Sequence, residues 1–175
     1  MLLENGLYVI HRGDDLVGRV KDPQGSASKL VYNKADKTNK ADEHYFAWYL
    51  EHDEDDGYRV SSPDRSENLA PDRKTGELLM EPAARTGHDD DGEPFSYPTS
   101  WTRWYLRPHP AFSMTPPITA SCCVEFVDGA SQWLSVPEPG KQCRVGTKEV
   151  SDDPRNLGKE EAAPFVFRFE RAIVR

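Results

Sequence analysis

Large apolar side chains alternate with polar or smaller ones in three short stretches of the chain, residues 45–51, 101–107 and 165–170. The stretches align without gaps, and two positions match in all three. The first is held by Trp48, Trp104 and Phe167, and the second, two residues later, by Leu50, Leu106 and Phe169. Because side chains of a strand point alternately to its two faces, this spacing predicts three half-buried β-strands.

A second pattern recurs before each of these strands, where a turn leads into a further strand. It reads Asn5-Gly6-Leu7-Tyr8 in the first copy and Asp56-Gly57-Tyr58 in the second. The third copy is degenerate, and residues 121–127 fit it with Val124 at the tyrosine position. Two short strands are predicted between the ends of each unit. They are residues 16–20 and 29–32, residues 67–70 and 77–80, and residues 132–136 and 143–145.

Four strands repeated three times indicate an all-β fold, a β-trefoil of twelve strands in three four-strand pseudo-repeats. We expect one domain over residues 1–175, with units at approximately 1–52, 53–110 and 111–175. Six strands would close a barrel, and six would form hairpins that cap one end. Another all-β fold, such as a sandwich, is the alternative, because it too has many short strands between turns.

The connections between the predicted strands carry most of the polar sequence. We expect loops at residues 35–43, 88–98 and 151–163. Residues 107–117 contain several prolines, which favour extended backbone there.

Composition narrows the possible functions. Of the 175 residues 30% are charged, and the net charge is −8, with no basic stripe for nucleic acid. No apolar run approaches membrane-spanning length, and the N-terminus lacks a signal-peptide pattern, so we expect a cytoplasmic protein. The three cysteines suit a reducing compartment. A bridge from Cys143 to Cys122 or Cys123 is the alternative.

No motif for catalysis, a metal or a cofactor is present. The acidic runs 53–56 and 89–91 lack EF-hand spacing and are predicted to be solvated loops. The histidines show no HExxH spacing, and there is no Gly-x-Ser-x-Gly elbow or phosphate-binding loop. We therefore expect a binding protein, not an enzyme. A glycan-binding lectin is one alternative, with Trp101 and Trp133 as the tryptophans freest to contact a sugar.

The first unit resembles a known family. Its start reads Gly6-x-Tyr8-x-Ile10, a Val17-Gly18-Arg19 step follows, and a variable loop leads into the apolar strand 29–32. In this it is similar to the fungal β-trefoil serine protease inhibitors (cospin-like). The likeness runs from the N-terminus to about residue 60. The mycocypins, fungal inhibitors of cysteine proteases, share this framework.

The resemblance implies a protease as partner and an exposed inter-strand loop as the binding site. In that family the loop between the second and third strands enters the protease cleft. The matching residues here are Lys21, Asp22, Pro23, Gln24, Gly25 and Ser26. A trypsin-like pocket would favour Lys21, whereas Gln24 or Ser26 would suit a different protease. The corresponding loop of the second unit offers Asp72, Arg73 and Lys74 as secondary candidates, and that of the third is residues 137–142. A cysteine protease inhibitor and a module for another protein partner are the remaining alternatives.

Overall fold

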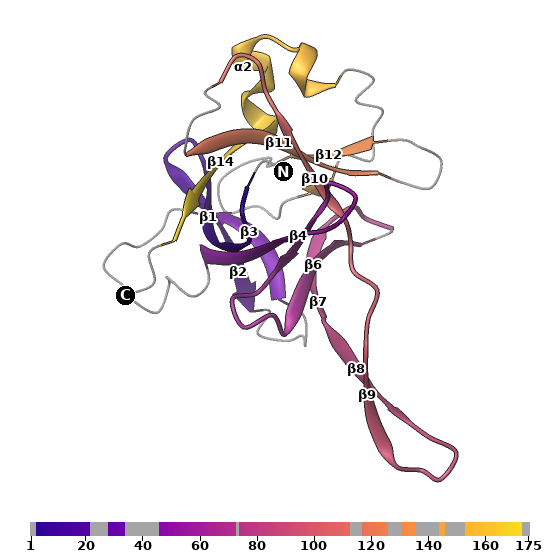
Figure 1. The fold of residues 1–175 in the computed structure, drawn as a ribbon. Helices are drawn as coiled ribbons and strands as arrows, with labels where there is room; N and C mark the ends of the chain where they lie inside the picture. The colour runs from indigo at the N-terminus through magenta and orange to yellow at the C-terminus, as the bar shows by residue number, and fades with distance from the viewer. Residues whose placement is uncertain are drawn as a thin grey trace.

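The chain forms an all-β fold with very little helix, organised around a closed six-stranded antiparallel barrel (Figure 1). The computed structural model describes residues 3–21, 28–33, 46–72, 74–112, 117–125, 131–135, 144–145 and 153–172. The barrel strands pair in the closed order β1, β4, β5, β10, β11, β14 and back to β1. They are β1 (Gly6–Arg12), β4 (Ala47–His52), β5 (Tyr58–Ser61), β10 (Trp104–Pro108), β11 (Ile118–Glu125) and β14 (Val166–Arg171). Closure leaves these strands without free edges.

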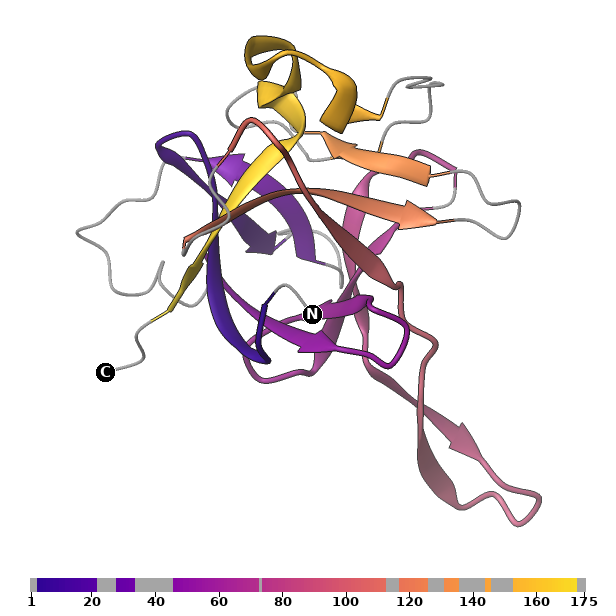
Figure 2. The same cartoon turned by 45° about the horizontal axis from the view of Figure 1, so that its top comes forward.

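Three hairpins follow the first, third and fifth barrel strands. They are β2 (Asp15–Lys21) with β3 (Ser28–Asn33), β6 (Glu67–Pro71) with β7 (Leu78–Pro82), and β12 (Ser131–Ser135) with β13 (Arg144–Val145). The strand predictions within the described residues are therefore confirmed to within a few residues at each end. A fourth hairpin, β8 (Ala84–His88) with β9 (Pro94–Pro98), belongs to no predicted strand and projects away from the barrel (Figures 1 and 2).

The recurring apolar positions form the core of the barrel. Trp48, Trp104 and Phe167 have exposed fractions of 0–1%. The indole N–H of Trp48 donates to the Val17 carbonyl at 2.9 Å, and that of Trp104 to the Leu69 carbonyl at 3.1 Å. Each tryptophan thus ties a barrel strand to the first strand of its own hairpin, and its polar atom is satisfied inside the core.

The register of the third unit differs from the prediction. Tyr8 lies opposite Trp48, and Tyr58 lies opposite Trp104, but Phe167 faces Ala120 rather than Val124. β11 begins three residues before the predicted start, at Ile118. Ala120 has no bulky side chain to mark this position in the sequence, whereas the β-branched Val124 resembles a strand-forming core residue.

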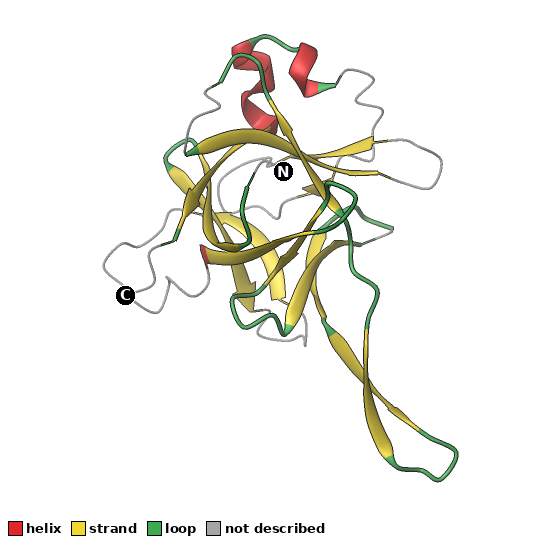
Figure 3. Cartoon of the chain, in the orientation of Figure 1, coloured by secondary structure: helices red, strands yellow, loops and turns green. Residues whose placement is uncertain are grey.

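The polar segment before the last strand is partly helical, not a simple loop. It contains η1 (Pro154–Asn156), α2 (Lys159–Ala162) and η2 (Ala163–Phe165), which Figure 3 shows over one end of the barrel. The Asp153 side chain accepts from the Arg155 N–H at 3.0 Å and so caps η1.

Within the proline-containing connection between β10 and β11, residues 109–112 form a turn instead of remaining extended. The Phe112 N–H donates to the His109 carbonyl at 3.0 Å. His109 is buried, its Nδ1 accepts from the Ala111 N–H at 3.1 Å, and its Nε2 lies 2.9 Å from the Pro154 carbonyl. With Nδ1 accepting, Nε2 is the donor, so one imidazole joins this connection to η1.

Candidate functional site

The predicted protease-binding loop leaves the sheet at the end of a long, regular hairpin. The β2–β3 ladder runs from the pair Leu16–Asn33 to the pair Lys21–Ser28 without a break. β1 borders this hairpin on one side and β7 on the other. Lys21 is thus the last residue of β2, and residues 22–27 lie outside the described residues. The structure therefore gives the predicted loop a firmly held base.

The secondary candidate loop of the second unit is a tight turn locked by Asp72. One carboxylate oxygen of Asp72 accepts from the N–H groups of Lys74 and Thr75, both at 2.8 Å, and from the Thr75 hydroxyl at 3.1 Å. Hydrogen bonds from the Thr75 and Lys74 backbone lower the pKa of Asp72. The Gly76 N–H donates to the Asp72 carbonyl at 2.8 Å, and Gly76 has a φ of 71°, a conformation that favours glycine.

A turn of this kind is poorly suited to entering a protease cleft. Protease clefts bind extended backbone through main-chain hydrogen bonds, and the N–H groups of Lys74 and Thr75 already donate to Asp72. Lys74 is exposed at the surface, whereas Arg73 lies outside the described residues. The third connection, residues 136–143, also lies outside them. Asp72 is therefore better explained as a structural residue of the turn than as a contact residue.

The expected polar loop at residues 88–98 is wrong, because most of it belongs to the β8–β9 hairpin. Five consecutive pairs join the strands, from Ala84–Pro98 to His88–Pro94. At the tip the Glu93 N–H donates to the Asp89 carboxylate at 2.8 Å, and Gly92 adopts a φ of 81°. The sequence does contain the signal for this hairpin, namely Asp91-Gly92 followed by alternating aromatic residues.

Phe95 and Tyr97 are the exposed large hydrophobic residues of the described chain, with exposed fractions of 48% and 42%. Their ring centroids lie 5.8 Å apart. Both rings lie over Gly87 of the partner strand, where a Cβ would come within 2.9 Å of Phe95 Cζ and 3.1 Å of Tyr97 Cε1. The two rings therefore form one apolar surface, and they pack closely on the strand below because Gly87 has no side chain.

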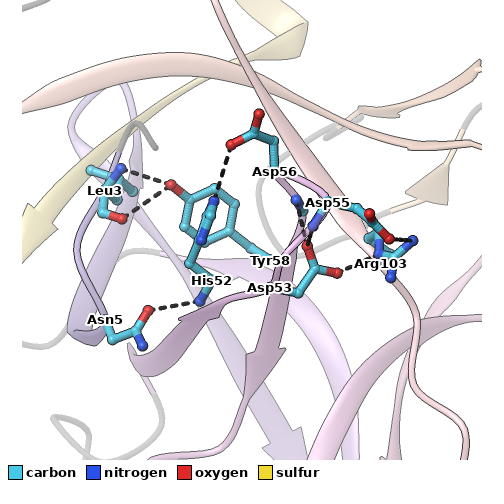
Figure 4. Close-up of polar contacts among 9 residues, drawn as sticks. Leu3, Asn5, His52, Asp53, Asp55, Asp56, Tyr58 and Arg103 are labelled. Atoms are coloured by element: carbon cyan, nitrogen blue, oxygen red, sulfur yellow. Dashed lines mark hydrogen bonds and ion pairs between the residues drawn. The ribbon is translucent and has the colours of Figure 1, made fainter.

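The acidic run 53–56 is solvated only in part. Asp53 forms an ion pair with Arg103, and the Asp55 carboxylate lies 3.0 Å from the same guanidinium (Figure 4). Burial alone would raise the pKa of Asp53, but hydrogen bonds from the Gly57 N–H and Arg103 outweigh it, so this pKa is lowered. These contacts hold the β4–β5 turn against the segment before β10. We therefore interpret the acidic run 53–56 as a structural part of the fold.

The N-terminal segment is tied to the same turn. The Tyr58 hydroxyl accepts from the Leu3 N–H at 2.8 Å and donates to the Leu3 carbonyl at 3.1 Å (Figure 4). The Asn5 side chain accepts from the His52 N–H at 2.7 Å. This explains why Tyr58 is buried although its hydroxyl is polar.

The tryptophans considered for a glycan site differ in exposure. Trp133 is 5% exposed, so the prediction that it is free to stack on a sugar is wrong. Trp101 is half-buried, with the Arg103 guanidinium 5.8 Å from its ring centroid. Neither tryptophan offers an open ring face of the kind seen at Phe95 and Tyr97.

Cys122 and Cys123 are buried, and burial raises the pKa of the Cys122 thiol. Cys143 lies outside the described residues. Within the described ranges, no three His, Cys, Asp or Glu side chains come together in a metal-binding arrangement. None of the helices formed there has the length and apolar character needed to cross a bilayer.

No family model matches the chain, and no curated protein matches it in sequence. Among solved structures it is similar to a proteinase inhibitor from Coprinopsis cinerea, with a TM-score of 0.57 and 14% sequence identity. The match covers 97% of this chain and 99% of that one. At this level of identity the likeness concerns the fold alone, and it extends over nearly the whole of both chains.

Proposed function

We propose that this protein is a protease inhibitor that binds through an exposed inter-strand loop on a β-trefoil framework and does not act as an enzyme. The observation that carries the proposal is the match to a proteinase inhibitor over 97% of the chain. The first-unit sequence pattern supports it independently, because Gly6-x-Tyr8-x-Ile10 and Val17-Gly18-Arg19 are a likeness in sequence and not in fold.

Three features support the β-trefoil framework. Each unit contributes its first and last strands to the barrel and its middle pair to a hairpin. The indole hydrogen bonds of Trp48 and Trp104 repeat between equivalent strands of the first two units. The pairs Tyr8–Trp48 and Tyr58–Trp104 repeat as well. One domain with units near residues 1–52, 53–110 and 111–175 accounts for all three.

The working part of the inhibitor is the β2–β3 loop, with Lys21, Gln24 and Ser26 as candidates for the primary pocket. Its base is an unbroken ladder bordered by strands on both sides, and a base held in this way reduces the conformational entropy that a loop loses on docking. If Lys21 fills the pocket, the target is a trypsin-like protease. If Gln24 or Ser26 fills it, the target is another serine protease or a cysteine protease.

Steady-state inhibition assays against trypsin, chymotrypsin, subtilisin and papain test the proposal. We expect at least one of these enzymes to be inhibited, and single alanine substitutions of Lys21, Gln24 and Ser26 identify the residue in the pocket. Lys74→Ala is the matched control, because Lys74 sits in the locked turn of the second unit. Full activity of all four enzymes with micromolar protein present would contradict the proposal.

A further inference from the structure

The β8–β9 hairpin, called the arm below (residues 84–98), has two chemically different faces. In its antiparallel register Arg85 lies opposite Tyr97, and Gly87 lies opposite Phe95, so these four residues share one face. Thr86 and Ser96, which pair between them, belong to the other. Phe95 and Tyr97 make up the apolar part of the first face, beside the charged Arg85, and no element among the described residues covers their rings.

The arm is anchored at its base and free along its length. At the base the Ala83 N–H donates to the Ser66 carbonyl at 2.8 Å, and the Thr99 hydroxyl donates to the Pro82 carbonyl at 2.7 Å. Beyond this point both views show the arm extending away from the barrel (Figures 1 and 2). The barrel does not use Phe95 and Tyr97 for its own core, so their exposure calls for a different explanation.

The face of the arm is better suited to binding than its edge. β9 begins at Pro94 and ends at Pro98, and neither residue has an N–H to donate to an added strand. Addition of a partner strand along β9 is therefore disfavoured. Phe95 and Tyr97, with few rotatable bonds and mutual packing, lose little entropy on burial, as binding anchors should.

The arm leaves the molecule on the side of the β3–β7 pair where the β2–β3 ladder ends. In the β3–β7 pair Lys29 lies opposite Leu79, and the strands are antiparallel. The arm follows the C-terminal end of β7. Because the two strands are antiparallel, this end of β7 lies beside the start of β3, where Ser28 pairs with Lys21 at the end of the β2–β3 ladder. A protein bound at the Lys21–Ser28 end of that hairpin would therefore lie next to the arm.

The charge of the arm's tip indicates what kind of surface it meets. Asp89, Asp90, Asp91 and Glu93 are all exposed there. Their complement is a basic surface. A second copy of this chain is a poor occupant, because two such faces of five-residue strands fall well short of the roughly 1,200 Å² that a specific stable interface buries.

We propose that the arm is a second contact with the inhibited protease, one that places Phe95 and Tyr97 in an apolar depression with a basic rim beside the catalytic cleft. This inference rests on the proposed inhibitory function. The β2–β3 loop then provides insertion into the cleft, and the arm selects among proteases with similar clefts.

The test compares inhibition constants for a protease that the wild-type chain inhibits. The double variant Phe95→Ser/Tyr97→Ser removes the aromatic face, and Thr86→Ala/Ser96→Ala alters the opposite face as the matched control. We expect the first variant to inhibit about tenfold or more weakly and the control to match wild type. Thermal melts confirm that both remain folded. A benzophenone photo-crosslinker at position 95, but not at position 86, is expected to capture the protease.

Each result distinguishes the two proposals. Equal inhibition constants for both variants, or no crosslink from position 95 to the protease, would overturn the arm contact and leave the inhibitor proposal standing. Crosslinking of position 95 to a second copy would replace the protease contact with self-association. If the wild-type chain inhibits none of trypsin, chymotrypsin, subtilisin and papain, both proposals fail.

Discussion

At the scale of single residues, close packing against one neighbouring side chain fixes the local conformation at several positions. Gly57 is the clearest case, since a Cβ at this position would lie 2.6 Å from Arg103 Cδ and even closer to its Cγ. The glycine here provides space and not unusual backbone freedom. It allows Arg103 to cross the β4–β5 turn and reach Asp53 and Asp55 (Figure 4).

Gly57→Ala is expected to displace Arg103 and to lower the free energy of unfolding by about 1–3 kcal/mol. Urea unfolding measures the change. The same substitution in an Arg103→Ala background removes the overlap, so it should then cost much less. An equal cost in both backgrounds would show that Arg103 is not the limiting neighbour.

Asp64 provides a residue-scale prediction for acid stability. Its carboxylate accepts from the Ser62 hydroxyl at 2.6 Å, the Ser66 hydroxyl at 2.8 Å and the Ser66 N–H at 3.1 Å. These bonds, that of Ser62 above all, lower its pKa from 3.8 to about 2. The stabilisation is therefore complete above about pH 4 and is lost as the pH falls through about 2.

Ser62→Ala should raise the pKa of Asp64 toward its ordinary value, and NMR titration of the Asp64 carboxyl measures it directly. Asp64→Asn should destabilise the protein at pH 7, and the difference from wild type should shrink as the pH approaches 2. An unchanged Asp64 pKa in Ser62→Ala would exclude the serine hydroxyl as the main cause.

At the scale of elements, the sequence predicts the barrel better than its additions. Trp48, Trp104 and Phe167 identify barrel strands because their burial enforces a period of two. The arm was not predicted although Asp91-Gly92 and the alternating Phe95 and Tyr97 signal a hairpin, because its strands face solvent on both sides and the acidic and proline residues around them are also typical of a loop. The short helices near residue 154 depend on long-range contacts such as that of His109, which local sequence does not reveal.

His109→Leu tests how the C-terminal helical segment is held to the barrel. The substitution leaves the carbonyl of the buried Pro154 without its imidazole partner, whereas the N–H of Ala111, an exposed residue, can turn to water. We expect a loss of about 1–3 kcal/mol in unfolding free energy for the carbonyl left unpaired. Amide exchange should also accelerate at Ala111. His88→Leu, in the exposed arm, is the control and should leave the unfolding free energy unchanged. An equal loss of unfolding free energy in His88→Leu would argue against a specific role of the His109 hydrogen bonds.

For the whole molecule, the fold and the candidate site were predictable to different degrees. The apolar pattern predicts the barrel strands. The predicted register is wrong in the third unit, where Ala120 takes the place of a tyrosine. The loop assignment rests on resemblance, because a loop that binds a partner has no packing constraint to leave a pattern. Structure adds what sequence did not indicate, a locked Asp72 turn just before β7 and an exposed aromatic arm just after β7, at the end of β7 that lies beside the start of β3.

The most direct test of inhibition through the β2–β3 loop replaces Lys21 by alanine and residues 22–26 by a Gly-Ser segment of equal length, and measures inhibition of trypsin, chymotrypsin, subtilisin and papain. The account predicts inhibition of at least one enzyme by the wild-type chain and a loss of about a hundredfold or more on replacement, since one pocket-filling side chain dominates such interfaces. The thermal midpoint should change little, because the β2–β3 ladder ends at Lys21 and Ser28. Undiminished inhibition by the replaced chain, or none by wild type, would contradict it.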